Sequence, residues 1–424
     1  NLSLNCEYGM SAFRRIIKKF VEKHSLITYG PIKYSKRLEK ISSAHPGVSV
    51  LMAAEVAPFY FWTGDPLRDK LTLNDWDIQF LVMGLDPRDY AGIPTLDRSG
   101  FSRYSWKSLL YLWPLAVLAF GVFSLKHKHP RFYVSDLLSW MIIFTGIFFT
   151  LKFFPFREVE YDQYHGRAGH GPYQAVIDHV AAKGGMVFWS NPEAKTRERD
   201  MGPVNFSSPH SLDLMKKTTG HTGFACFYEG YRKAGGPGGV WDEMLLEYCS
   251  GEREHPAWTI GEMAFHGSEA GGSKKIDEVQ TVFLVKKNTP DHILDAMREG
   301  RMYALRRSPE YRLILGSFKV AADGGSGEAF MGGELFSPGP VKVSFSVGWE
   351  GMPKDRVTAS LIRSGEIVKE FDIQSPGELE YTDTFYEPGK KVYYRLDVRG
   401  KYPNMLFSNP VFVSYSGEGV NSEL

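Results

Sequence analysis

Short apolar runs alternate with amphipathic stretches along the chain as far as about residue 306. Two amphipathic stretches carry helix boundaries: Pro172 stands at a first helical position with Gly184 at the stop, and Thr289 is an N-cap with Gly300 after the last turn. This alternation predicts a parallel α/β sheet or barrel, in which functional residues follow the strand ends. The runs interpreted as strands are VSVLMAAE, IQFLVMGL, GGMVFWSNPE, TGFACFYEG, PAWTIGEMAFHG and VQTVFLVKK.

Two longer apolar segments interrupt this pattern, at Trp106 to Leu125 and Leu137 to Phe156. Each is close to the roughly twenty residues that cross a bilayer, so we predict a transmembrane hairpin inserted between two strand-helix units. The alternative is a pair of buried core helices. The connection KHKHPR carries Lys126, Lys128 and Arg131, which by the positive-inside tendency predicts a cytoplasmic turn. We therefore expect a cell-membrane protein with its bulk on the extracytoplasmic (periplasmic) side.

The pattern differs at the two ends of the chain. From Ser11, SAFRRIIKKFVEKH places apolar residues on one helical face and basic residues on the other, which predicts a surface helix; contact with anionic lipid is the alternative. After about Ser308, VKVSFSV alternates with period two, and VTASLIRSGEIVKEFDI indicates two strands joined at Ser364 and Gly365. Several such short strands predict an antiparallel β-sandwich.

Length and composition limit the classes of protein. A chain of 424 residues is expected to form two or three folded units, and 50 basic against 49 acidic residues give no support to a nucleic-acid partner. The predicted segments are residues 1–100 and 159–307 for an α/β unit, 101–158 for the hairpin and 308–424 for the sandwich. Three cysteines are too few for a disulfide framework; one pair could bridge, but buried free thiols are favoured.

The strand-end segments GGMVFWSNPE, TGFACFYEG, PAWTIGEMAFHG and TVFLVKKNTPDHILDAMREGRMYA follow one another in an order that resembles the polymerase and histidinol phosphatase (PHP) family of metal-dependent phosphoesterases. The likeness covers about residues 1–306, and YYRLDVRGKYPNMLFSNPVFV resembles the β-sandwich that often follows a secreted PHP domain. The resemblance implies an α/β fold: a distorted (β/α)7 barrel with the inserted hairpin, followed by the sandwich. It also implies a cluster of two or three Zn, Mn or Fe ions.

Most metal ligands of that family are replaced in this chain. Ser3 and Asn5 stand for the first His-x-His, Gln79 for a histidine, Asn191 for the histidine of a His-Pro pair, and Ala264 for an aspartate. Of the family's ligands, only Glu55 and His266 remain. Hydroxyl, amide and methyl side chains bind transition metals poorly, so we expect no metal and no other cofactor. Further acidic residues that could complete a pocket are Glu193, Glu229 and Glu262.

These observations lead to the hypothesis of a pseudoenzyme. A PHP-like protein without its ligands would act as an extracytoplasmic scaffold or accessory subunit, with the lipid bilayer and other membrane protein subunits as partners. One alternative is an active phosphoesterase that holds Zn, Mn or Fe on Glu55, His266 and one of Glu193, Glu229 or Glu262. Another is a small-molecule binding module that uses Asn5, Gln79, Asn191 and an aromatic rim.

Overall fold

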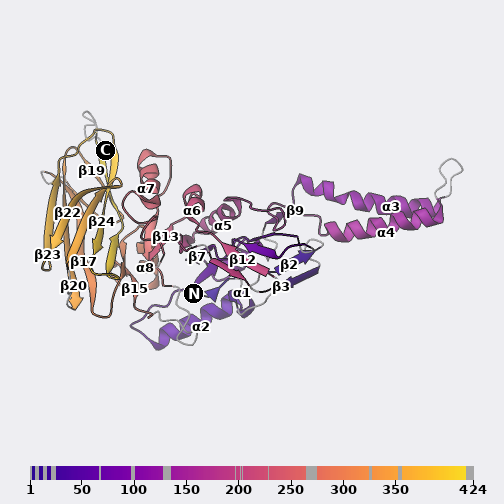
Figure 1. Cartoon of the computed structure of the whole chain (residues 1–424), viewed down its shortest axis with the longest axis horizontal. Coiled ribbons are helices and arrows are strands. Elements are labelled where there is room, and N and C mark those ends of the chain that lie inside the picture. Colours follow the sequence, from indigo (N-terminus) through magenta and orange to yellow (C-terminus); the bar gives the residue numbers. More distant parts are fainter. Residues whose placement is uncertain are drawn as a thin grey trace.

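The computed structural model describes most of the chain as a mixed α/β protein with two apolar helices. In Figure 1 the molecule is elongated, with a β-rich domain at one end, an α/β body in the middle and a helical hairpin projecting from the other end. The described residues are 2–4, 9–12, 17–20, 25–65, 68–96, 101–127, 135–195, 197–200, 202, 204–227, 229–263, 275–323, 327–351 and 356–416.

A six-stranded sheet lies in the α/β body, in the order β1-β4-β7-β10-β13-β14. Strand β7 is antiparallel to both of its neighbours, so the expectation of a parallel sheet is wrong at this strand. Within the described residues the sheet is open, and barrel closure stays a prediction. The strands are β1 (Leu2–Ser3), β4 (Ala53–Val56), β7 (Gln79–Met83), β10 (Met186–Ser190), β13 (Gly223–Phe227) and β14 (Trp258–Gly261).

Helices accompany these strands. The predicted boundaries at Pro172 and Thr289 are confirmed, because Pro172 lies in the first turn of α5 and Thr289 is the N-cap of α8. Phe80 and Trp189 meet edge to face in the core at a centroid distance of 4.6 Å, beside Tyr173 of α5. The helices are α1 (Leu26–Tyr29), α2 (Pro31–Ala44), α5 (Gly171–Ala181), α6 (Leu212–Lys217), α7 (Val240–Ser250) and α8 (Pro290–Arg298).

Two smaller sheets adjoin the body. In the first, β12 pairs with β6 and β11, and β6 pairs with β5. In the second, β2 (Gly9–Ala12) and β3 (Ile17–Phe20) form an antiparallel pair, so the predicted amphipathic helix from Ser11 is wrong. Its apolar spacing suited a helix, but β-branched Ile17 also favours a strand, and strand pairing overrides helix periodicity here. The strands of the first sheet are β5 (Phe61–Thr63), β6 (Leu71–Asn74), β11 (Arg197–Asp200) and β12 (Val204–Ser208).

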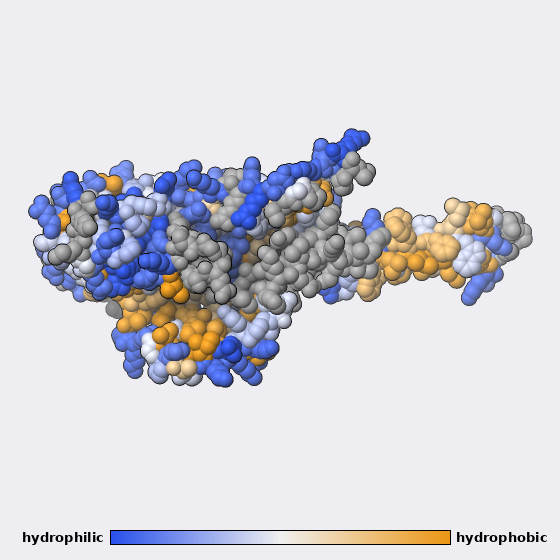
Figure 2. Space-filling view, turned by 60° about the horizontal axis from the view of Figure 1, so that its bottom comes forward, coloured by the Kyte–Doolittle hydropathy of each residue, from blue (hydrophilic) through white to orange (hydrophobic). Residues whose placement is uncertain are grey.

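The projecting hairpin consists of α3 (Trp113–Lys126), preceded by the 3-10 helix η4 (Trp106–Leu112), and α4 (Asp136–Phe153). Trp106–Lys126 and Asp136–Phe153 are long and apolar enough to cross a membrane, and only 22% and 17% of their most apolar windows are buried. The alternative of buried core helices is therefore wrong. Figure 2 shows a predominantly hydrophobic surface along the hairpin, whereas the coloured surface of the rest of the molecule is largely hydrophilic apart from one hydrophobic patch.

The β-rich domain contains two sheets whose buried faces share one apolar core. The predicted alternation in VKVSFSV and the turn at Ser364 and Gly365 are confirmed. Its strands are β15 (Val279–Phe283), β16 (Met302–Arg306), β17 (Tyr311–Ala322), β18 (Glu328–Phe330), β19 (Glu334–Ser337), β20 (Val341–Gly351), β21 (Val357–Arg363), β22 (Glu366–Ile373), β23 (Gly377–Asp383), β24 (Lys391–Arg399), β25 (Met405–Ser408) and β26 (Val411–Tyr415).

A buried ion pair links the α/β body to the β-rich domain. Strand β16, which we expected in the α/β unit, pairs with β25 of the β-rich domain. Arg395 of β24 donates two hydrogen bonds of 2.7 and 2.6 Å to Asp242 of α7, and both side chains are almost fully buried. This junction fixes the position of the β-rich domain against the strand ends of the body.

Candidate functional site

The polar residues at the strand ends lie on one face of the six-stranded sheet. Ser3 is the register partner of Glu55, and Glu55 is the partner of Leu81. Gln79, two residues before Leu81, is the partner of Ser190. Because side chains alternate along a strand, Glu55, Gln79 and Ser190 share this face. Strand β7 is antiparallel, which places its first residue, Gln79, at the same edge as the last residues of β4 and β10.

Glu262 reaches this face as well. Strand β14 ends at Gly261, so strand alternation no longer directs the next side chain, and the Glu262 N–H donates to the carbonyl of Phe227 at 2.8 Å. The Ser190 hydroxyl donates to Glu262 Oε2 at 2.7 Å, and the Asn191 amide donates to Ser190 Oγ at 3.2 Å. Glu262 and Asn191, two of the predicted positions, thus belong to one hydrogen-bonded group centred on Ser190. The sequence patterns did not single out Ser190.

Three predicted positions, Asn5, Ala264 and His266, lie outside the described residues, and for Ser3 only the backbone is described. Among the side chains that the structure describes, no three His, Cys, Asp or Glu residues are grouped so that they could hold a metal ion. The described part of this face therefore offers carboxylate, amide and hydroxyl groups that can hydrogen-bond.

Glu193 and Glu229 lie in a separate cleft with a volume of about 500 Å3, to which Glu262 does not contribute. These two residues follow β10 and β13, so the cleft opens at the carboxyl ends of parallel strands, where α/β proteins commonly bind ligands. The β-rich domain contributes a wall through Arg306 and Tyr402. The other lining residues are Ala194, Lys195, His210, Leu212, Tyr231, Arg232 and Lys233.

Glu193 organises the glycine-rich loop beside the cleft. Its carboxylate accepts hydrogen bonds from the backbone N–H groups of Arg232, at 3.0 Å, and Ala234. Further along the loop, the N–H groups of Gly235 and Gly239 donate to carbonyls of the same loop. These backbone donors are therefore used within the protein, and the loop acts as a structural turn before α7.

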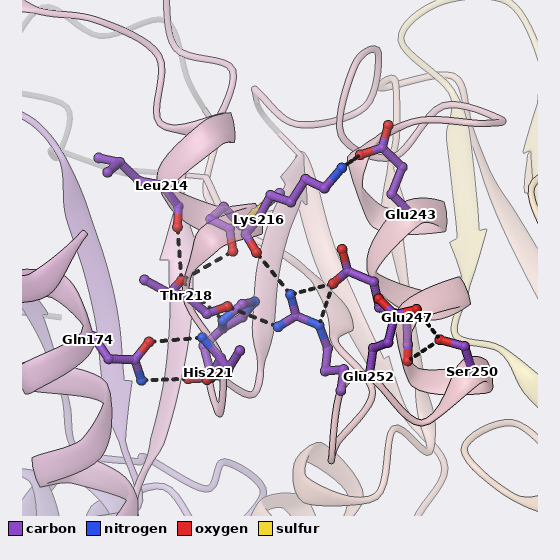
Figure 3. Close-up of polar contacts among 12 residues, drawn as sticks. Gln174, Leu214, Lys216, Thr218, His221, Glu243, Glu247, Ser250 and Glu252 are labelled. Carbon is purple, nitrogen blue, oxygen red and sulfur yellow. Dashed lines mark hydrogen bonds and ion pairs between the residues drawn. The ribbon is translucent and has the colours of Figure 1, made fainter. Parts of the chain in front are cut away.

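Polar contacts connect α6 with α7 beside the cleft, and Figure 3 shows them. Arg253 donates to Glu247 Oε2 at 2.9 Å and to the carbonyl of Thr218 at 2.9 Å, which ties the end of α6 to α7. Burial, and secondarily the nearby Arg253, lower the pKa of His221 to about 3, so this imidazole is neutral at physiological pH. The network immobilises α6, which begins at Leu212 in the cleft wall.

Sequence patterns could assign some of the lining residues to the cleft, but not others. Lys195 stands close to Asn191 in the chain, and its charge was the available signal. Arg306 and Tyr402 come from distant segments and reach the cleft only through the pairing of β16 with β25. Comparison of the chain with protein-family models and with curated proteins finds no match.

Proposed function

We propose that this protein is a membrane-anchored, catalytically degenerate PHP-like protein that serves as a scaffold or accessory subunit of a membrane assembly. The observation that carries the membrane part is the exposed apolar surface of the hairpin. Helix α4 has 18 residues, which at about 1.5 Å per residue gives about 27 Å, close to the ~30 Å hydrocarbon core of a bilayer. Exposure of this much apolar surface to water is unfavourable, and lipid removes that cost.

Contacts at the base of the hairpin hold it in one direction relative to the body, as expected for a membrane anchor. Strands β8 (Ser102–Arg103) and β9 (Glu158–Val159) pair where the hairpin leaves the body. Glu158 accepts a hydrogen bond of 2.6 Å from Ser105 and forms an ion pair of 3.1 Å with Lys107. Trp106 lies beside this base and is 71% exposed, as expected for an aromatic residue at a membrane interface. The proposal places the body on the extracytoplasmic side and the turn after Lys126 in the cytoplasm.

The degenerate nature of the site rests on the replaced ligands. Ser3, Asn5, Gln79, Asn191 and Ala264 stand where the PHP resemblance implies histidines and an aspartate, and Glu262 is hydrogen-bonded to Ser190. A catalytic cluster needs about four to six ligands for each ion, which Glu55 and His266 alone do not supply. A protein that keeps its fold but lacks the metal cluster has this surface available for binding protein partners.

Membrane anchoring is tested by extraction of membranes from cells that express the full chain. We expect wild-type protein to stay in the alkaline-washed membrane pellet and to require detergent for release. Phe144→Lys with Ile147→Lys places two charges on exposed apolar positions of α4 and should abolish retention. Phe336→Lys, at an exposed apolar position of the β-rich domain, is the matched control and should stay in the pellet. Wild-type protein released by the alkaline wash would refute the membrane anchor.

The degenerate site is tested separately, by metal content and phosphatase activity of the detergent-purified protein. We expect wild-type protein to carry far less than one Zn, Mn or Fe per chain and to leave phosphate esters intact. The comparison variant restores the family ligands with Ser3→His, Asn5→His, Gln79→His, Asn191→His and Ala264→Asp. Stoichiometric metal with chelator-sensitive hydrolysis in the wild type would favour the phosphoesterase hypothesis instead.

A further inference from the structure

We propose that α2 and the loop that follows it form a docking surface for an acidic amphipathic helix from another subunit of the membrane assembly. This inference rests on the proposed scaffold function and deepens it, because it names the surface and the chemistry of the partner. Helix α2 has 14 residues, none of which is buried. Isolated helices of about this length are marginally stable in water, so α2 gains from a further contact.

The basic side chains of α2 are not neutralised within the part of the chain that the structure describes. None of them forms an ion pair with another described residue, and Lys33 lies over the ring of Tyr29, 4.9 Å from its centroid. The one acidic residue of the helix, Glu39, accepts a hydrogen bond of 3.0 Å from Ser35. The basic residues of the helix are Lys33, Lys36, Arg37 and Lys40.

The spacing of these basic residues makes α2 less stable on its own. Positions 33 and 37, and positions 36 and 40, are four residues apart, so like charges are neighbours on the helix surface. Such pairs destabilise a helix by about 0.2–0.5 kcal/mol each. Carboxylates of a partner placed beside them would replace this repulsion with attraction.

An apolar row runs along α2 and continues into the following loop. Tyr34, Leu38 and Ile41 recur at spacings of four and three residues, so they lie on one face of the helix. Tyr34 packs against the core of the body, whereas Ile41 is exposed. Val48 in the loop is 57% exposed, and its carbonyl accepts a hydrogen bond of 3.2 Å from Ser42 near the end of α2. Figure 2, in which the lower edge of Figure 1 is turned forward, shows a hydrophobic patch on this side of the molecule, where the apolar side chains of a partner can pack.

A second basic segment borders this apolar surface. The hydroxyl of Ser49, next to Val48, donates to the carbonyl of Asn288 at 3.3 Å, which holds the loop against this segment. The two residues before Asn288, Lys286 and Lys287, are exposed and form no ion pair with another described residue. The nearby carboxylate of Asp291 lies in the first turn of α8, where the helix dipole favours it. Basic side chains of two segments thus flank the apolar surface, which suits an apolar helix face bordered by carboxylates.

The position and the charge of this surface favour a protein partner over a bilayer or a second copy of this chain. In Figure 1, α2 lies along the lower edge of the body, well short of the end from which the hairpin projects, so a bilayer around the hairpin would not reach it. A second copy related by a two-fold axis would bring the same basic residues together, and like charges repel. An acidic amphipathic helix supplies apolar residues and opposite charges at once.

Site-specific photo-crosslinking of the full chain, in membranes of cells that make it, tests the proposal. Ile41→p-benzoylphenylalanine places the reactive group at the exposed end of the apolar row, and Phe336→p-benzoylphenylalanine is the control at an exposed position of the β-rich domain. On irradiation we expect a protein adduct from position 41 and none from position 336. The partner peptide identified in the adduct by mass spectrometry should come from an amphipathic helix rich in Asp and Glu.

Charge reversal on α2 gives a second measurement. Arg37→Glu with Lys40→Glu should lower the adduct yield from position 41 at least about tenfold, because like charges would then face the partner. The same variant places opposite charges four residues from the lysines at positions 33 and 36, so α2 itself should be no less stable, and a thermal melt verifies this. The control, Lys217→Glu with Lys369→Glu, reverses two exposed lysines outside α2 and should give the unchanged yield.

Every other outcome overturns the proposal. These outcomes are no adduct from position 41, an adduct with lipid, with a second copy of this chain or with a segment that lacks acidic residues, and equal yields from the charge-reversed variant and its control. Alkaline extraction of the same membranes separates them from a failure of the anchor. A chain that stays in the pellet without an adduct is anchored but lacks this docking surface, whereas a chain released by the wash refutes the anchor and leaves the adduct to be judged by itself.

Discussion

The internal contacts of the hairpin are made at small residues, whereas those of the α/β body are made by large aromatic residues. In the hairpin, an added Cβ at Gly121 or Gly146 would lie 2.8 Å from the facing helix, whereas Phe120 and Phe144 point outward and are exposed. In the body, Trp189 and Trp241 are fully buried. The body is thus stabilised by removing aromatic surface from water, whereas the hairpin depends on close backbone packing between two helices whose outer surfaces are apolar. Substitutions should therefore have their largest effects in the body.

The largest effect is expected at the buried pair of Asp242 and Arg395. Arg395→Met leaves the Asp242 carboxylate buried without its cation, and should lower the free energy of unfolding by about 3–5 kcal/mol. Denaturant unfolding, followed by the intrinsic fluorescence of the tryptophans, measures this change. Arg356→Ala breaks the exposed pair with Asp372 and should cost less than about 1 kcal/mol. Similar losses for both variants would contradict the importance given to burial.

A second effect in the body is its dependence on pH through His221. Burial lowers its pKa to about 3 in the fold, against about 6.5 when unfolded, so the unfolded state binds more protons between these values. Stability from this group is complete above about pH 6.5 and declines as the pH falls toward 3, by about 1.4 kcal/mol per unit. Between pH 7 and 5 the loss should be about 2 kcal/mol.

Unfolding of His221→Gln and His210→Gln at both pH values isolates this contribution. The first variant should lose about 2 kcal/mol less between pH 7 and 5 than wild type, because its side chain does not titrate. His210→Gln is the control for the loss of a histidine at an exposed position. If the pH dependence of His221→Gln matches that of wild type, the buried imidazole is not responsible.

The same contrast explains which features the sequence could predict. Periodicity and caps predicted β10, β13, α5 and α8, because their boundaries are set locally by glycine, proline and N-cap residues. The antiparallel direction of β7 and the pairing of β16 with β25 of the β-rich domain are set by contacts between distant segments, which periodicity does not encode. The strand-end residues Gln79 and Asn191 were singled out through the PHP resemblance, whereas Tyr402 reaches the cleft from a distant loop.

Close packing of the two hairpin helices depends on Gly146. A Cβ at position 146 would lie 2.8 Å from the Cα of Leu118, a backbone atom that cannot rotate away. Gly146→Ala should therefore push α3 away from α4. It should lower the free energy of unfolding of the detergent-solubilised protein by about 1–3 kcal/mol, as measured by thermal unfolding. Ile147→Ala, one residue further and outward-facing, is the control and should have little effect. A larger loss at position 147 would show that the outer surface carries the helix contact.

The smallest effect is expected at the hydroxyl pair inside the hairpin. Ser124 donates to Ser139 at 3.1 Å and also bonds the carbonyl of Gly121 at 2.9 Å, so its hydroxyl keeps a partner when Ser139 is replaced. Ser139→Ala should therefore cost only about 0.6 kcal/mol, the average for hydrogen bonds between membrane helices. The measurement is again the thermal stability in detergent. A cost near that of Gly146→Ala would mean that polar pairing, rather than backbone approach, dominates this contact.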